Sequence, residues 1–180
     1  IYQINLAIAG IAVGTVSLPV LAKSLKIGKI LQATHIQNKS IELSFLLSLP
    51  ASVGLILASE QIVNALFGYG SFVQEDVIST SLALKYFGFG VPAFALVKIL
   101  SNFFFARDDT KTPFYLSLLS VILNVLISVT YFREVGFVII PIATSISTWV
   151  SVIFYLILLN KSKFLIIKNL PYINIFKIIF

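Results

Sequence analysis

Residues 112–132 have the sequence TPFYLSLLSVILNVLISVTYF and contain no charged side chain. A helix needs about 20 apolar residues to cross a bilayer, and this run has that length. Buried β-strands usually end near 8 residues, so a strand does not account for the run. Residues 112–132 therefore predict a transmembrane helix. Thr112 as N-cap and Pro113 as first helical residue suit its beginning.

Further apolar runs occupy residues 1–22, 43–59, 77–106 and 135–160, and a shorter one covers residues 170–180. Together they predict an all-α, polytopic transmembrane helix bundle with about five full spans and a partial sixth. Residues 66–72, LFGYGSF, are amphipathic and broken by glycine, so they predict an interfacial helix and turn. A membrane β-barrel would need alternating polarity in segments of roughly 10 residues, and the sequence does not alternate in this way.

The composition agrees with a membrane protein. Hydrophobic residues make up 58% of the 180 residues and charged residues 11%, whereas soluble domains carry about 25% charged residues. A soluble core of this size could not bury so much apolar surface. Cysteine is absent, which excludes a disulfide framework. The chain begins in an apolar run without Met or a basic segment, so we expect a fragment of a longer protein rather than a signal peptide.

Basic residues divide unevenly among the expected loops. Loops 23–41, 107–111 and 161–168 hold nine Lys and Arg residues, and the other two loops hold only Arg133. Cytoplasmic loops of membrane proteins are enriched in Lys and Arg. The net charge of +6 therefore indicates membrane topology rather than nucleic-acid binding. It predicts that these three loops are cytoplasmic and that residue 1 lies outside.

No catalytic constellation is visible. The chain has one histidine, His35, and no acidic residue inside a full span. Neither metal-assisted hydrolysis nor Ser-His-Asp chemistry has the residues it needs. We therefore expect no enzymatic activity, and a solvated loop position for His35.

Lys98 is the most informative charged residue. It lies nine positions before Arg107, which is about 13 Å along a helix axis from that end. A charge at this depth must face a wet cavity or a partner. It either contacts an anion in a transport cavity, or it is a structural lysine that snorkels or pairs with a carboxylate. Lys85 lies nearer the outer end, where snorkelling is favoured.

Polar side chains occur on the last two full spans. Asn124 and Ser128 are four residues apart and share a helix face. Thr144, Ser145 and Ser147 lie on the next span. These groups could line a cavity, bind a small cation or join neighbouring helices, and the spacing alone favours interhelical hydrogen bonds.

Glycine and proline mark two further features. Gly10 and Gly14 form a G-x-x-x-G pattern, which predicts close helix packing. Gly88, Gly90 and Pro92 interrupt the third span and predict a kink or hinge.

Four segments occur in a recognisable order: 14–19 (GTVSLP), 66–72 (LFGYGSF), 97–100 (VKIL) and 105–113 (FARDDTKTP). The chain thereby resembles the MurJ/MviN family of lipid II flippases, within the multidrug/oligosaccharidyl-lipid/polysaccharide exporter superfamily. Segment 105–113 following Val97 and Lys98 is the most specific. The resemblance implies that residues 1–160 form most of a carboxyl-terminal lobe, from the eighth to the twelfth helix. Residues 161–180 would then form a cytoplasmic loop and the start of the next helix.

The resemblance also implies a function. Family members move undecaprenyl-pyrophosphate-linked disaccharide-pentapeptide across the bacterial inner membrane by alternating access. This headgroup cannot cross hydrocarbon unaided, because desolvating its charges is prohibitive. Lys98 and Arg107 are the candidate cavity residues here, and the expected partners are this lipid and the membrane lipids. The family's essential cavity arginines lie outside this sequence, so the fragment alone should not transport. No cofactor is expected.

Sodium-binding members of the family have a cation site whose matching positions are Asn124, Ser128, the carbonyl of Ile140 and Thr144. Ser128 stands where those members carry an acid. A neutral serine leaves a cation less compensated, so we expect weakened or absent sodium coupling.

Three alternatives remain open. One is another exporter of the superfamily, for polysaccharide lipids or drugs. Another is a membrane-embedded enzyme acting on prenyl lipids, although Asp108 and Asp109, its only acidic pair, are better explained as loop residues beside Arg107 and Lys111. The third is a non-functional, truncated membrane scaffold, which the sequence preceding Ile1 would distinguish.

Overall fold

The computed structural model describes residues 3, 7–70 and 72–162, and these residues form helices and short connections. A π-helical turn, η1 (Ala7–Ala12), continues into α2 (Val13–Lys26). Then follow α3 (Ile30–Leu57), α4 (Ser59–Phe67), α5 (Gln74–Phe105) and α6 (Lys111–Val135). A single 3-10 turn, η2 (Gly136–Val138), leads into α7 (Ile139–Lys161). The all-α bundle is thus confirmed.

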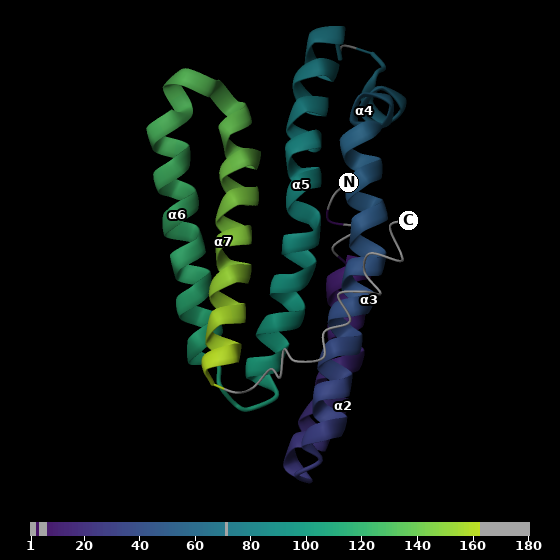
Figure 1. Ribbon diagram of the computed structural model, residues 1–180. Coiled ribbons are helices and arrows are strands. Elements are labelled where there is room, and N and C mark those ends of the chain that lie inside the picture. The colour runs from purple at the N-terminus through teal and green to yellow at the C-terminus, as the bar shows by residue number, and fades with distance from the viewer. Residues whose placement is uncertain (1–2, 4–6, 71, 163–180) are drawn as a thin grey trace.

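Four stretches among the described residues are long and apolar enough to cross a membrane: Ala7–Lys26, Ile30–Leu57, Gln74–Phe105 and Lys111–Lys161. The last stretch contains two helices, α6 and α7, which η2 joins and which run side by side in opposite directions (Figure 1). The five predicted full spans therefore correspond to five long helices. The predicted sixth span, 170–180, and the loop beyond residue 162 lie outside the described residues.

The predicted loop 23–41 is wrong in extent. The connection between α2 and α3 covers only residues 27–29, and both His35 and Lys39 lie on α3. Residues 30–42 contain neither glycine nor proline, so nothing in them ends a helix. Gly28, at φ +75°, supplies the left-handed turn. His35 is exposed, as expected, but from a helix.

The other boundaries differ less. Residues 66–72 contain the end of the short helix α4 and a turn, which confirms the predicted helix and turn. The connection between α6 and α7 is Gly136–Val138, where Gly136 has a φ of +72°. Residues 133–135 complete the last turn of α6 because Gly136 is the first residue there with a left-handed backbone.

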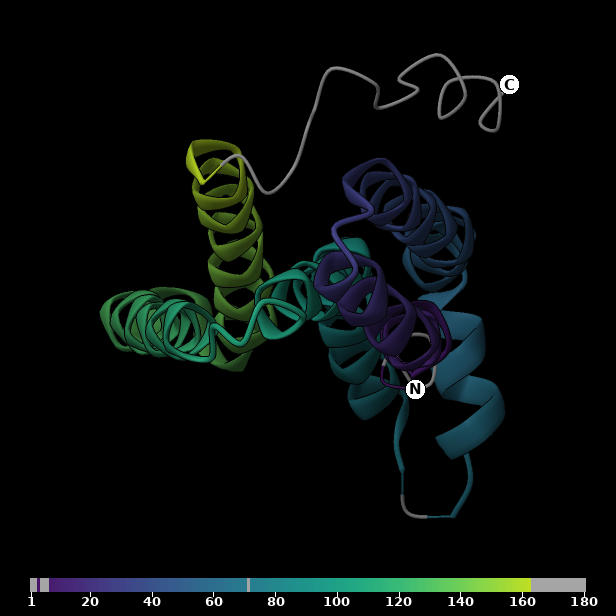
Figure 2. The same ribbon diagram turned by 90° about the horizontal axis from the view of Figure 1, so that it is seen from below.

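α5 is the central helix of the bundle. It packs against α3 and α2 on one side and against α7 on the other, and α6 packs mainly against α7. Figure 1 and the view from below in Figure 2 both show α5 between the α2–α3 pair and the α6–α7 pair. The main core lies around the second half of α5, where Phe104 stacks at a tilt on Tyr155 of α7 with ring centroids 5.8 Å apart.

Many large apolar side chains point outward. Val16, Leu57 and Val129 are 72%, 76% and 73% exposed. A water-soluble protein of this size would bury such residues, whereas lipid solvates them. The outer surface of the bundle therefore agrees with a position inside a bilayer.

Candidate functional site

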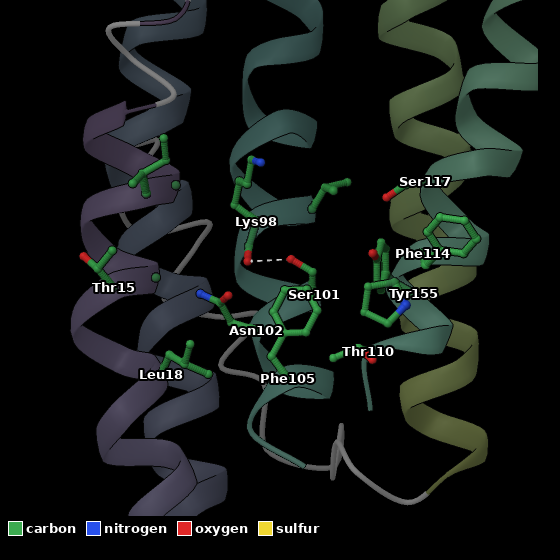
Figure 3. A pocket seen from close by; sticks show the side chains of 15 residues that line it. Thr15, Leu18, Lys98, Ser101, Asn102, Phe105, Thr110, Phe114, Ser117 and Tyr155 are labelled. Atoms are coloured by element: carbon green, nitrogen blue, oxygen red, sulfur yellow. Dashed lines mark hydrogen bonds between the residues drawn. The ribbon is translucent and has the colours of Figure 1, made fainter. Parts of the chain in front are cut away.

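One face of α5 forms the floor of a groove between α2 and α6 (Figure 3). Lys98, Ser101, Asn102 and Phe105 are spaced i, i+3, i+4 and i+7, so they share this face. The groove has a volume of about 600 Å³. The walls come from η1 and α2 (Gly10, Ile11, Gly14, Thr15, Leu18), from α6 with the residue before it (Thr110, Pro113, Phe114, Ser117), and from Tyr155 of α7.

Lys98 has an exposed side chain in this groove. It also lines a second hollow of about 230 Å³ between α5, α6 and α7. Within the described residues the one ion pair joins Lys39 to Glu42, with Nζ 3.3 Å from Oε2. The structure therefore gives no support to the carboxylate-paired explanation of Lys98, and it places the residue where two hollows meet.

Gly14 allows α2 to approach α5 closely. A Cβ atom at Gly14 would lie 2.6 Å from Nδ2 of Asn102, a distance that real Cβ contacts do not reach. The close packing predicted from the glycine pattern is confirmed at this position. The Asn102 side chain thus lies on the groove floor next to α2, while Ser101 Oγ donates to the Lys98 carbonyl at 3.0 Å.

Arg107, the second predicted cavity residue, is not brought to this groove. Its guanidinium donates from Nη1 to the Phe103 carbonyl at 2.6 Å, at the end of α5. Burial lowers the pKa of Arg107, but an arginine stays charged at neutral pH. The structure thus leaves Arg107 beside the last turn of α5, where a cation interacts favourably with the helix dipole.

Asp109, rather than Thr112, caps the beginning of α6. Its Oδ1 accepts from the backbone N–H groups of Lys111 and Thr112, both at 3.1 Å, and its Oδ2 accepts from the Thr112 hydroxyl at 2.7 Å. The hydrogen bonds from Thr112 hold the pKa of Asp109 below its ordinary value. The predicted Thr112 cap is therefore wrong, because an ionised carboxylate at residue 109 accepts these bonds more strongly than a hydroxyl.

Neighbouring helices on both sides donate hydrogen bonds to the predicted kink region of α5. Pro92 has no N–H, so the Gly88 carbonyl lacks its normal helical donor. Ser52 Oγ of α3 donates to this carbonyl at 2.7 Å. On the opposite side, α7 donates to two nearby carbonyls: Ser145 Oγ to Tyr86 at 2.9 Å and Trp149 Nε1 to Phe89 at 3.0 Å.

Gly88 and Gly90 allow α3 and α7 to pack closely against this turn of α5. A Cβ at Gly88 would lie 2.9 Å from Ile56 Cγ1 of α3, and one at Gly90 would lie 2.6 Å from Ser145 Oγ of α7. Gly88, Gly90 and Pro92 are all buried within one continuous helix. The proline turn of α5 is therefore hydrogen-bonded to α3 on one side and to α7 on the other.

Three of the four predicted cation-site groups lie together. Asn124 Nδ2 donates to Thr144 Oγ1 at 2.8 Å, and Thr144 Oγ1 donates to the Ile140 carbonyl at 2.7 Å. The interhelical hydrogen bond favoured by the spacing is thereby confirmed. The fourth group, Ser128 Oγ, is buried without a hydrogen-bond partner in the described residues. Since the described groups are neutral and largely bonded to one another, they do not fit a cation without an added carboxylate.

The sequence alone missed several residues of these sites. Ser101 and Asn102 could have been found, because they follow Lys98 at helical spacing. Ser52 and Trp149 could not, since the proline predicts a free carbonyl but not which neighbouring helix supplies the donor.

The chain is similar to known proteins along its whole length. The family profile described as "Lipid II flippase MurJ" matches residues 1–180. The chain is 40% identical over 151 residues to a probable lipid II flippase MurJ of Rhizobium meliloti (strain 1021), covering 84% of this chain and 28% of that protein. It is 32% identical over 180 residues to a probable lipid II flippase MurJ of Buchnera aphidicola subsp. Acyrthosiphon pisum, covering 98% and 35%.

A solved structure described as lipid II flippase MurJ in an inward closed conformation superposes with a TM-score of 0.84 at 23% identity. The match covers 98% of this chain and 36% of that one, and it shows the same fold. The chain thus spans about a third of the length of the relatives it matches. With a profile match along its whole length, this chain belongs to the lipid II flippase MurJ family.

Proposed function

We propose that this chain is part of the carboxyl-terminal lobe of a protein that moves lipid II from the inner to the outer leaflet by alternating access. The observation that carries the proposal is Lys98, a lysine without a carboxylate partner in the described residues, exposed in a groove of about 600 Å³. The names of the related proteins support it. Neither polysaccharide export nor a scaffold role is favoured by any particular contact.

The chemistry of the groove suits an anionic amphiphile. Lys98 offers a cation, and Asn102, Ser101 and Ser117 offer an amide and hydroxyl groups for sugars or phosphate oxygens. Aromatic and aliphatic side chains line the rest. A pyrophosphate-sugar headgroup would exchange water for these groups while its polyprenyl chain stays in hydrocarbon.

The proline turn of α5 is proposed as the pivot of the movement. Lys98 follows Pro92 by six residues, which is about 9 Å along the helix, so the groove lies on one side of the turn. Bending at the turn would change the separation of α2 and α6, which form the two groove walls. Hinges of this kind absorb large dihedral changes in a few residues. The predicted hinge at Gly88, Gly90 and Pro92 thus remains part of the proposal.

We further propose a multi-pass position in the bacterial inner membrane, with the basic connections on the cytoplasmic side. The α2–α3 and α5–α6 connections and the end of α7 lie at the same end of the bundle (Figure 1). The excess of Lys and Arg at this end supports the orientation. Within the described residues the neutral groups around Asn124 support weak or absent coupling to sodium.

The test of the function is substitution of Lys98 in the full-length protein. Loss of a charged hydrogen bond costs roughly 1.5–3 kcal/mol, so Lys98→Gln should lower the lipid II reaching the outer leaflet by about tenfold or more, and Lys98→Arg should lower it less. Lipid II accessible to an added external enzyme is the measurement, with membrane insertion measured in parallel.

Lys85→Gln is the matched control. Lys85 is the other lysine within α5, it is exposed, and it lines neither groove that contains Lys98. Normal transport by Lys98→Gln, or an equal defect in both variants, would remove the support for the groove as the substrate path.

A further inference from the structure

The tip of the α2–α3 hairpin carries charge and exposed apolar side chains together. Lys23, Lys26 and Lys29 are all exposed there. Next to them, Ile27, Ile30 and Leu31 are 59%, 55% and 87% exposed. Elsewhere exposed apolar side chains stand beside mixed or acidic charge, for example Phe132 and Val135 beside Arg133 and Glu134.

No carboxylate balances these lysines within the described residues. Glu42 is the first acidic residue along the chain, and it bonds Lys39 at 3.3 Å. A hollow of about 450 Å³ opens at the tip and is lined by Lys23, Lys29, Ser24, Gln32, Val20 and Ile27, together with a proline. The hollow is therefore lined by two lysines, a glutamine and a serine together with aliphatic side chains.

The position of the tip matches the lipid headgroups. Ala7–Lys26 comprises 20 residues, or about 30 Å of helix, which is the thickness of the bilayer hydrocarbon. A helix of this length is long enough to carry the three lysines at its end into the headgroup region. Figure 1 shows the hairpin reaching past the α5–α6 connection at the same end of the bundle, so its tip is not covered by α5, α6 or α7.

We propose that the α2–α3 tip binds anionic phospholipid of the cytoplasmic leaflet, with the lysines on headgroup phosphates and Ile27, Ile30 and Leu31 at the acyl boundary. Charge complementarity selects this occupant, because lysines interleaved with exposed aliphatic residues are the pattern of interfacial anionic-lipid binding. A free phosphate ion would use the lysines and leave the aliphatic side chains in water. The proposal rests on the proposed membrane orientation and not on transport of lipid II.

The test uses the full-length protein in a background without other cysteines, labelled at Leu31→Cys with an environment-sensitive fluorophore. It is reconstituted in vesicles of phosphatidylcholine or of an equal mixture with phosphatidylglycerol. Phosphatidylglycerol with quencher-bearing acyl chains should quench the label several-fold more than phosphatidylcholine carrying the same quencher. Each lysine near an anionic surface is worth about fivefold in affinity, so replacing Lys23, Lys26 and Lys29 by Gln should abolish the preference.

A matched triple variant replaces Lys39, Lys111 and Lys161 by Gln. It removes the same charge from the same end of the molecule and should keep the preference. High salt should weaken the preference through screening, and inorganic pyrophosphate at the same ionic strength should add nothing further.

Three results would overturn the proposal. Equal quenching by the two lipids would remove lipid selectivity. A preference that survives in the Lys23/Lys26/Lys29 variant would remove the lysines from the site. A label shielded from lipid and from an aqueous quencher alike would show that another part of the protein covers the tip. None of these readouts involves lipid II, so the outcome is separate from the test of Lys98.

Discussion

Replacing Ser52 by Ala isolates the hydrogen bond that compensates for Pro92. Ser52 is 6% exposed, and its Oγ donates to the Gly88 carbonyl at 2.7 Å. Because Pro92 has no N–H, this carbonyl has no helical donor to return to when Ser52 is removed. A buried unsatisfied carbonyl costs about 1–3 kcal/mol, and interhelical polar bonds in membrane proteins reach about 1.7 kcal/mol. We therefore expect Ser52→Ala to lower the free energy of unfolding by about 1–2 kcal/mol.

A double-mutant cycle separates this bond from the rest of the serine contact. In a Pro92→Ala background, residue 92 regains an N–H that can bond the Gly88 carbonyl, so Ser52→Ala should then cost little. The expected coupling energy is about 1 kcal/mol. The assay is reversible unfolding of the full-length protein in mixed detergent micelles. Ser40→Ala is the control, because Ser40 Oγ donates to Ile36 within its own helix at 2.8 Å.

Equal costs for Ser52→Ala with Pro92 in place and in the Pro92→Ala background would refute the reasoning. Such a result would mean that the serine stabilises the α3–α5 contact without reference to the proline. A large loss of stability in Ser40→Ala would also contradict the reasoning. Any buried serine of α3 would then have the same effect, whether or not it bonds a carbonyl left free by a proline.

Three further variants test other contacts. Gly14→Ala would place a methyl group 2.6 Å from Asn102 Nδ2; because this atom ends a flexible side chain that can turn into the groove, the loss of stability in thermal unfolding should be no more than about 1 kcal/mol, and Asn102→Ala should remove it. Asp109→Ala should cost about 1 kcal/mol at neutral pH. The pKa of Asp109 is lowered in the folded state, so the carboxylate stabilises the fold above the ordinary carboxyl pKa, and this stabilisation is lost as the pH falls through the folded pKa, below about pH 4. Chemical unfolding of the protein and the variant at several pH values checks this. A difference in stability between the two that persists at lower pH would contradict it. Ser128→Asp should add a sodium-dependent rise in melting temperature that the unsubstituted protein lacks.

The fold could be predicted from sequence where a single property decides it. The uncharged run 112–132 became α6, and the run 77–106 became α5 with almost the same ends. The loop 23–41 was wrong because lysines were taken to end a span, although a helix can continue beyond the hydrocarbon. Gly28, not the charge, ends α2 and begins α3.

The candidate sites divide in a similar way. The depth of Lys98 and an interhelical hydrogen bond near Asn124 could be predicted, since burial cost and helical spacing act locally. The hydrogen bonds from Ser52 and Trp149 to α5 could not be predicted, because both residues are far from Pro92 in sequence. Their roles depend on which helices pack together, and that arrangement is a property of the whole bundle.

The most direct test of the account is whether Lys98 faces water inside the bilayer. In a background without other cysteines, Lys98→Cys should react with a charged, water-soluble thiol reagent. Leu118→Cys serves as the lipid-facing control, because Leu118 is exposed on α6 at a comparable distance from the α5–α6 connection and lines neither groove that contains Lys98. We predict that Lys98→Cys reacts much faster and that excess lipid II slows the reaction. Equal, slow reaction at both positions would show that the groove is dry and would contradict the account.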